Sequence, residues 1–244
     1  MDAEKSFTYP FEDKEWISKL GLGALISMVP ILNFAWSGYL VDILRNMMNH
    51  AVEPLPTWDD LSKKFSDGLI LFAAGLVYAL PILIPLLLPL GVAISSGLSS
   101  GIRNMQDIGQ TLTEAGGALF FCLLCVLLLY GLVLSVIYPA ILVQFAREGT
   151  FASCFKLNEA FGMIRKNAVA FFTAWGLSLA ASIGVGLIVG FVNLVVGWVP
   201  CIGWIVGLVL TLASGIYSTV VYAHLFGQFG RIVFGRNYPV SNNE

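Results

Sequence analysis

The sequence predicts an all-α integral membrane protein, a polytopic transmembrane helical bundle that forms one membrane domain over residues 1–244. Two observations carry this prediction. Of the 244 residues, 57% are hydrophobic and 11% are charged, against about 45–50% and about 25% in soluble domains. The apolar residues also form runs longer than the roughly 18 residues that indicate a spanning helix. These runs cover residues 68–95, 115–146, 167–199 and 201–227.

The basic residues predict the orientation. All 13 Lys and Arg residues except Arg103 fall in clusters, and the positive-inside rule places such clusters in the cytoplasm. The clusters lie on one side only if residues 16–48 form a helical hairpin that enters and leaves there, turning at residues 29–33. Each arm of about 14 residues would be about 21 Å long, which is short for a hydrocarbon core of about 30 Å. We therefore expect a short or re-entrant hairpin.

The remaining segments follow from this orientation. The expected order is a cytoplasmic N-terminus (1–15), the helical hairpin (16–48), a cytoplasmic interfacial segment (49–66), a span (68–95), an outside loop (96–114), a span (115–146), a second cytoplasmic interfacial segment (147–166), a closing helical hairpin (167–228) and a cytoplasmic tail (229–244). The closing hairpin supplies two spans and turns outside at residues 198–201, so four long spans follow the first hairpin. Both termini are expected in the cytoplasm.

The two interfacial segments are predicted to form amphipathic helices that lie in the cytoplasmic interface. Thr57 and Asp60 form a T-x-x-D capping box in the first segment, and Thr150 can cap a helix in the second. Aromatic side chains would anchor the segments at headgroup level, and basic side chains would contact anionic lipid. These candidate lipid contacts are Trp58, Lys63, Lys64, Phe155, Arg165 and Lys166. Simple anchoring explains them without a specific lipid site.

An internal repeat is predicted from a pattern at the ends of three helices, in which an aromatic residue is followed by a polar residue six positions later and an arginine nine positions later. The copies are Trp36, Asp42 and Arg45; Tyr138, Gln144 and Arg147; and Tyr222, Gln228 and Arg231. The first two copies are each followed by an interfacial segment and a returning span. This indicates a pseudo-repeat of units with the same orientation, as in some transporters. Alternatively, helices that leave the membrane at this interface share these residue preferences.

The closing hairpin carries small residues at multiples of four positions. In its first helix they are Ser178, Ser182, Gly186 and Gly190, and in its second Gly203, Gly207 and Gly215. Small residues let helix backbones approach closely in lipid, so we expect these two sets to face each other or a second copy. In the span 68–95, Pro81, Pro85 and Pro89 remove backbone donors. They indicate either a broken helix that lines a cavity or a bent packing helix.

Recognisable chemistry is scarce in the sequence. It contains no paired carboxylates in a span, no HExxH motif, no nucleophile elbow and no phosphate loop. Cys122 and Cys125 lie in an apolar run, where packing thiols are expected. His224 is the one ionisable side chain expected well inside the bilayer, as a hydrogen-bonded packing residue or a proton relay. We expect no enzyme, no cofactor and no metal.

The N-terminal part of the chain resembles a known family. The residues that carry the resemblance are 7–16, Lys19, 21–23, Val29 and Pro30, Gly38 and Tyr39, Arg45, and 55–60. They resemble a family of small bacterial and archaeal membrane proteins catalogued as domain of unknown function 4013, which implies a prokaryotic cytoplasmic membrane. More loosely, the alternation of spans and interfacial helices is similar to the membrane domain of some bacterial glycerophosphodiester phosphodiesterases, although this sequence shows no catalytic domain.

Three functions are compatible with these features. The first is a non-catalytic integral membrane protein that self-assembles or organises a membrane complex or lipid. Its partners would be membrane lipids and a second copy or another membrane protein, with no nucleic acid because the net charge is −2. The alternative is a small-solute or ion transporter or channel built on the parallel repeat. A lipid-acting enzyme would require His50, Asp59, Asp60 and Asp67 to cluster.

Overall fold

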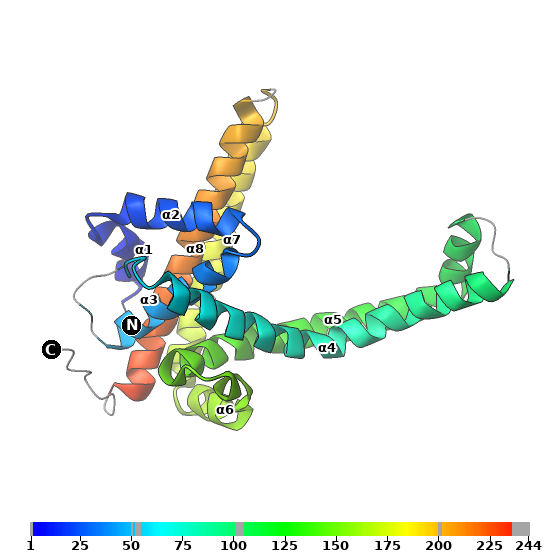
Figure 1. The fold of residues 1–244 in the computed structure, drawn as a ribbon, viewed down its shortest axis with the longest axis horizontal. Helices are drawn as coiled ribbons and strands as arrows, with labels where there is room; N and C mark the ends of the chain where they lie inside the picture. Colours follow the sequence, from blue (N-terminus) through cyan, green and yellow to red (C-terminus); the bar gives the residue numbers. More distant parts are fainter. Residues whose placement is uncertain (1, 50, 52–54, 101–104, 200–201, 236–244) are drawn as a thin grey trace. The chain divides into compact units, whose positions relative to one another are not determined.

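The computed structural model describes residues 2–49, 51, 55–100, 105–199 and 202–235. All secondary structure in these residues is helical (Figure 1), which confirms the all-α prediction. The elements are α1 (Ala3–Glu12), α2 (Trp16–Met28), α3 (Asn33–Met48), α4 (Leu61–Ser100), α5 (Met105–Glu148), the short 3-10 helix η1 (Phe151–Phe155), α6 (Leu157–Lys166), α7 (Ala168–Val196) and α8 (Ile202–Phe234).

Four of these helices are long and apolar enough to span a membrane, as predicted. The apolar stretches are Leu61–Leu83, Leu124–Glu148, Ala168–Val196 and Ile202–Phe234, with mean hydropathies of 1.8, 2.5, 2.3 and 1.8. Only 6% of the most apolar window of α7 is buried inside the protein. A helix that is apolar all round and hardly covered by protein is typical of one that lipid surrounds.

The chain forms two units. The first contains Met1–Phe72 and Pro139–Glu244, and the second contains Ala73–Tyr138. In the second unit α4 and α5 run side by side, and the hydroxyl of Tyr130 donates a hydrogen bond to the carbonyl of Tyr78 (2.8 Å). α4 continues as one helix through Pro81, Pro85 and Pro89, which favours the packing interpretation over a broken helix. The side chains of Pro85 and Pro89 lie outside the described residues.

The first unit is built around α3 and one end of α8. Ala35, Tyr39 and Ile43 of α3 and, except for Tyr222, the residues from Val220 to Phe229 of α8 are almost entirely buried. α7 joins this core through Phe171, whose ring lies 5.3 Å from that of Phe229. The core therefore lies where α3 meets this end of α8, while the far parts of α7 and α8 are exposed.

The segment 16–48, expected as a helical hairpin, contains two helices. α2 and α3 are separated by residues 29–32 and pack against each other. Pro30 disfavours the helical conformation of the residue before it, and Val29 accordingly leaves α2 in an extended conformation. Whether this pair enters and leaves the membrane on one side stays a prediction.

Two expected segments differ from the structure, and a third contains an unpredicted helix. Residues 1–15, expected as a cytoplasmic N-terminus, contain α1, which begins where Asp2 accepts a hydrogen bond from the N–H of Lys5 (3.1 Å). The expected outside loop at 96–114 is helical at 96–100 and 105–114, because a helix continues past its last apolar residue until something breaks it. No separate helix occupies the described part of 49–66, since α4 already begins at Leu61. Arg103 and most of the 198–201 turn and the C-terminal tail lie outside the described residues.

Candidate headgroup site

The site begins where α5 ends. Gly149 follows α5 with a φ of 67°, a left-handed conformation that favours glycine, and its N–H donates to the carbonyl of Phe145 (2.7 Å). η1 and α6 follow directly. Thr150, predicted to cap a helix here, precedes η1 without a side-chain cap hydrogen bond.

α6 is amphipathic, as predicted for the segment 147–166. Ala160, Met163 and Ile164 are buried on one face, whereas Arg165 and Lys166 are exposed. η1 adds an edge-to-face contact between Phe151 and Phe155, whose ring centres lie 5.0 Å apart. α6 therefore has one buried face, while the place of the segment in the membrane interface stays a prediction.

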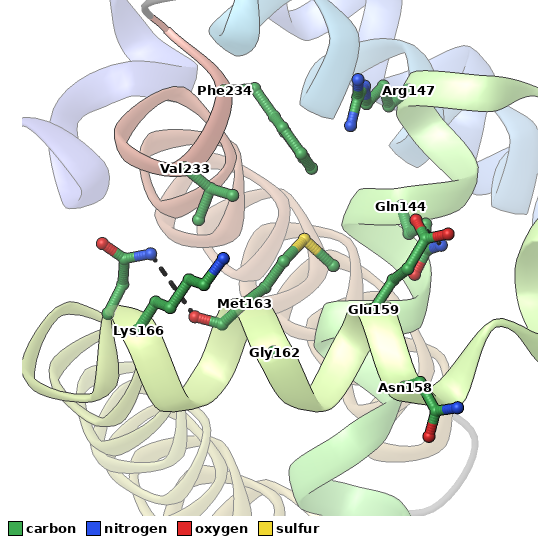
Figure 2. Close-up of a pocket in the computed structure, with 10 residues that line it drawn as sticks. Gln144, Arg147, Asn158, Glu159, Gly162, Met163, Lys166, Val233 and Phe234 are labelled. Atoms are coloured by element: carbon green, nitrogen blue, oxygen red, sulfur yellow. Dashed lines mark hydrogen bonds between the residues drawn. The ribbon is translucent and has the colours of Figure 1, made fainter.

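A cavity of about 410 Å³ lies among the ends of α5, α6 and α8 (Figure 2). Its size falls in the range of small-molecule sites. Its lining combines apolar side chains with charged and amide groups. The lining residues are Gln144, Arg147, Asn158, Glu159, Gly162, Met163, Lys166, Asn167, Val233 and Phe234.

Two cations face this cavity. The guanidinium of Arg147 lies over the ring of Phe234, 4.4 Å from its centre, a cation–π contact that holds the side chain in place. Lys166 lines the cavity from the last turn of α6. Among the described residues, neither cation forms a salt bridge with a carboxylate, so both can bind an anion.

A glutamine and a glutamate that form a hydrogen bond with each other also line this cavity. Gln144, which is 2% exposed, donates from its Nε2 to Oε2 of Glu159 (3.1 Å). Its Oε1 is buried and has no hydrogen-bond donor among the described residues. A buried acceptor without a donor costs about 1–3 kcal/mol, so a ligand that supplies a donor would be stabilised here.

Glu159 is also linked to a neighbouring pair. Lys156 forms salt bridges with Glu148 (2.9 Å) and with Glu159 (3.6 Å). The hydrogen bond to Glu148 is the main cause that raises the pKa of Lys156 above its ordinary value. Lys156 therefore stays charged at neutral pH and leaves one oxygen of Glu159 facing Gln144.

A second polar cluster joins α3 to the start of α4. Arg45 pairs with Asp42 (3.1 Å) and with Asp67, and Lys64 pairs with the other oxygen of Asp42 (3.1 Å). Arg45 also donates to the carbonyl of Ala146 at the end of α5 (3.0 Å). The salt bridge between Asp42 and Arg45, three positions apart on α3, is thus one part of a larger network.

The same crossing requires two glycines. A Cβ at Gly38 would overlap the backbone carbonyl of Lys64, and a Cβ at Gly68 would overlap that of Phe34. The backbones of α3 and α4 thus touch at the crossing. Neither glycine belongs to a repeating series of small residues, so the sequence pattern does not predict this contact.

Trp58 packs within the protein rather than as a free headgroup anchor. Its ring stacks on Tyr39 at 4.5 Å, and Tyr39 stacks on Trp36 at 5.3 Å. Its Nε1 donates to the carbonyl of Lys19 (2.9 Å). The prediction that Lys64 contacts lipid is wrong, because this side chain is 4% exposed and paired with Asp42.

Lys19 and Asp13 form hydrogen bonds that hold the segment 55–60 next to the stacked aromatic rings. Lys19 Nζ donates to Asp13 (2.8 Å) and to the carbonyl of Leu55 (3.2 Å). Burial by itself would raise the pKa of Asp13, but hydrogen bonds from Lys19 and from the backbone of Glu15 and Leu55 outweigh it and lower the pKa. Many of the residues that carried the family resemblance therefore contact one another inside the protein.

His224 lies in a buried contact between α8 and α1. Its Nδ1 is 2.9 Å from Ser6 Oγ, and its ring centre is 4.2 Å from that of Tyr9. Gln228, one turn later, donates to the carbonyl of Asp2 (3.0 Å). His224 is 0% exposed, which fits a hydrogen-bonded packing residue better than a proton relay.

The three copies of the repeat pattern end close together. A Cβ at Gly230 would lie 2.6 Å from Met48 Sδ and 3.0 Å from a methyl group of Val143, so the ends of α3, α5 and α8 converge. The corresponding side chains play different parts. Asp42 pairs with cations, Gln144 lines the cavity, and Gln228 binds α1. Trp36 is buried, whereas Tyr138 is exposed and Tyr222 and Arg231 are half-buried.

The small residues of the closing hairpin divide into two groups. Ser178 is buried, and at Gly203 and Gly207 a Cβ would approach Val196 and Asn193 of α7. Ser182, Gly186, Gly190 and Gly215 are exposed, and a Cβ at these glycines would meet nothing within 4 Å. Only the first group packs within the hairpin. The second group leaves the predicted contact with a second copy untested.

The proposed acidic cluster of a lipid-acting enzyme is not assembled by its described members. Asp67 pairs with Arg45, Asp59 and Asp60 are exposed, and His50 lies outside the described residues. Among the described residues, no three His, Cys, Asp or Glu side chains could hold a metal ion. Burial raises the pKa of Cys154 to about 11, so this thiol is not activated. Cys125 is exposed, and the side chain of Cys122 is outside the described set.

The fold defines a class of protein, an all-α chain with four helices capable of spanning a membrane. Within this class the chain belongs to the family described as Protein of unknown function (DUF4013), whose model matches residues 22–194. The match begins inside α2, ends near the end of α7, and includes the α3–α4 crossing and most of the cavity. No curated protein and no solved structure matches the chain.

Some residues that line the cavity belong to sequence patterns that did not predict a cavity. Gln144 and Arg147 stood in the repeat pattern, and Lys166 among the candidate lipid contacts. Glu159 and Phe234 were missed, since a lone acidic residue and a lone aromatic residue carry no pattern. Of the other candidate lipid contacts, Lys63 and Arg165 are exposed and Phe155 is half-buried.

Proposed function

We propose that this is a non-catalytic integral membrane protein of the cytoplasmic membrane that organises phospholipid at the cytoplasmic face. The observation that carries the proposal is the cavity in which Arg147 and Lys166 have no carboxylate partner among the described residues and lie beside the apolar side chains of Val233 and Phe234. A phosphate with an attached acyl glycerol offers the matching combination of anion and apolar chain. Cations at the end of a spanning helix commonly contact such headgroups.

The arrangement of helix ends supports the orientation that this function needs. The ends of α3, α5 and α8 converge near Gly230, and each carries an arginine of the repeat pattern. Under the positive-inside rule these ends lie in the cytoplasm. The cavity and the amphipathic helix α6 would then lie at the cytoplasmic headgroup level, and the convergence of three similar ends supports the pseudo-repeat.

The lengths of α2 and α3 support a re-entrant hairpin. With 13 and 16 residues, they reach about 20 Å and about 24 Å, which is less than a hydrocarbon core of about 30 Å. Both would enter from the cytoplasmic side and return to it. The N-terminal helix α1, which binds the end of α8, would also be cytoplasmic.

The proposal is tested by the lipid that the purified chain retains. The protein is extracted in mild detergent, and bound phospholipid is counted by native mass spectrometry. We expect one retained phospholipid, and we expect the Arg147→Gln, Lys166→Gln double variant to lose it. Arg165→Gln is the matched control, because Arg165 is exposed beside Lys166 but does not line the cavity. Equal retention by the double variant and the control would reject the site.

Self-assembly is a second candidate, which a different observation supports. Ser182, Gly186 and Gly190 form an exposed strip of small residues on α7 with open space above the two glycines. Such strips bring helices together in lipid. A discrete oligomer of the intact chain in mild detergent would support this candidate, and a uniform monomer would exclude it.

A further inference from the structure

We propose that the cavity among α5, α6 and α8 recognises a zwitterionic phospholipid headgroup that joins a phosphate to a primary ammonium group. The phosphate would face Arg147 and Lys166, and the ammonium group would face Glu159 and Gln144. This inference rests on the proposed function, because it names the lipid class that the same site binds.

The anionic half of the ligand follows from the unpaired cations. Lys19, Arg45, Lys64 and Lys156 of the same unit each pair with a carboxylate. Arg147 and Lys166 differ from them, because the described residues give them no carboxylate partner although both line one cavity. Phosphate oxygens accept hydrogen bonds from both kinds of cation.

The cationic half follows from Gln144 and Glu159. Gln144 Oε1 is buried without a donor, while Nε2 already donates to the Glu159 carboxylate. Turning the amide over would set Oε1 against that carboxylate, two acceptors facing each other. Because Gln144 lines the cavity, a ligand there can bring the donor. An ammonium group carries three donors and a positive charge, so it can donate to Gln144 Oε1 and to the Glu159 carboxylate, which also contacts Lys156 (3.6 Å).

The arrangement of these side chains fits one ligand with two charged ends. Figure 2 shows Glu159 beside Gln144, with Lys166 further along α6 and Arg147 next to Phe234. Lys166 and Arg147 lie on different sides of the cavity, and Glu159 and Gln144 lie on a further part of its wall. A headgroup with a phosphate alone would add no donor for Gln144 Oε1.

The inference is tested with three lipids that share the same acyl chains. The delipidated full-length protein is titrated by native mass spectrometry with phosphatidylethanolamine, phosphatidylcholine and phosphatidylglycerol. Choline keeps the positive charge but has no N–H donor, and glycerol has donors but no charge. We expect phosphatidylethanolamine to bind about tenfold more tightly than either, which corresponds to about 1.4 kcal/mol.

Glu159→Gln should remove this preference. The matched control is Glu148→Gln, because Glu148 pairs with the same Lys156 but does not line the cavity. We expect Glu159→Gln to bind the three lipids equally and Glu148→Gln to keep the preference. Because Glu159 is largely exposed, its substitution leaves the core unchanged.

The possible results separate the two proposals. If the three lipids bind wild type equally and the Arg147→Gln, Lys166→Gln variant loses all of them, the headgroup inference is overturned while the lipid function stands. If that variant keeps all three lipids, both proposals fail. Soluble O-phosphoethanolamine tests the source of the ligand. Should it bind as tightly as phosphatidylethanolamine, the site takes a free phosphate ester and the lipid inference is overturned.

Discussion

The crossing of α3 and α4 and the exposed strip of α7 use glycine in opposite ways. At the crossing, Gly38 and Gly68 lie against the backbone of the opposite helix, and a buried charge network surrounds them. On α7, Gly186 and Gly190 face open space beside apolar side chains such as Leu187, which is 70% exposed. Glycine allows close approach in both places, but only the crossing has a partner within the chain. We therefore expect contacts within the chain to stabilise the crossing, and contacts with lipid or a second copy to stabilise the exposed strip of α7.

The largest effect is expected at the crossing. Gly38→Ala or Gly68→Ala would drive a methyl group into a backbone carbonyl that no rotamer change can move. Overpacking usually costs about 1–3 kcal/mol and more where the backbone must shift, so we expect a loss above about 3 kcal/mol. Thermal unfolding in detergent measures it. Gly21→Ala is the control, since a Cβ there meets nothing within 4 Å. Equal melting temperatures for Gly38→Ala and Gly21→Ala would show that the backbones do not touch.

The charge network should give the next effect. Arg45→Gln leaves Asp42 and Asp67 without the cation that both contact. Breaking a buried pair costs about 3–5 kcal/mol; because Arg45 remains 16% exposed, we expect about 3 kcal/mol. Lys63→Gln, an exposed substitution on the same helix, should change little. Adding Asp67→Asn to Arg45→Gln should cost less than the two separate losses together. Strictly additive losses would mean that the pair is not coupled.

The sequence was sufficient for what depends on long apolar runs, which predicted the four long helices. The hairpin over 16–48, which the clustering of Lys and Arg predicts, stays a prediction. Sequence patterns did not predict the environment of a side chain where a single contact within the protein determines it. Trp58 and Lys64 looked like interfacial residues, because amphipathic spacing alone cannot tell a lipid-facing side chain from one that contacts Tyr39 or Asp42.

The cavity shows the same limit. Arg147 is distinguished by its position over Phe234, which lies 87 positions later in the sequence, and Gln144 by the lack of a donor at Oε1. Both properties depend on how α5, α6 and α8 meet. The small residues of α7 were also identified correctly as a series, but their spacing could not show which of them have a partner within the chain.

A smaller, pH-dependent effect is expected at Asp13. Its folded pKa lies below the ordinary value of 3.8, so its contribution to stability is complete above that pH and is lost as the pH falls through the folded pKa. Asp13→Asn should cost about 1.5–3 kcal/mol at pH 7, as for a hydrogen-bonded charge. Melting temperatures of wild type and variant should converge in the acidic range below 3.8. An Asp13→Asn difference that persists unchanged there would show that the carboxylate charge is not what binds Lys19.

The smallest effect on the folded chain is expected on α7, and it tests the other half of the comparison. Gly186→Ala and Gly190→Ala place methyl groups in open space, so the stability of the monomer should change by less than about 1 kcal/mol. If this strip contacts a second copy, the bulkier Gly186→Leu, Gly190→Leu variant should lower the mass of the particle in mild detergent to that of one chain. Gly176→Leu is the control on the same helix, because Gly176 is exposed and lies off the strip, with nothing within 4 Å of its Cβ. If the oligomer persists in the double variant, the strip contacts lipid and not a second copy. The crossing of α3 and α4 would then be the place where glycine brings two helices of this comparison into contact.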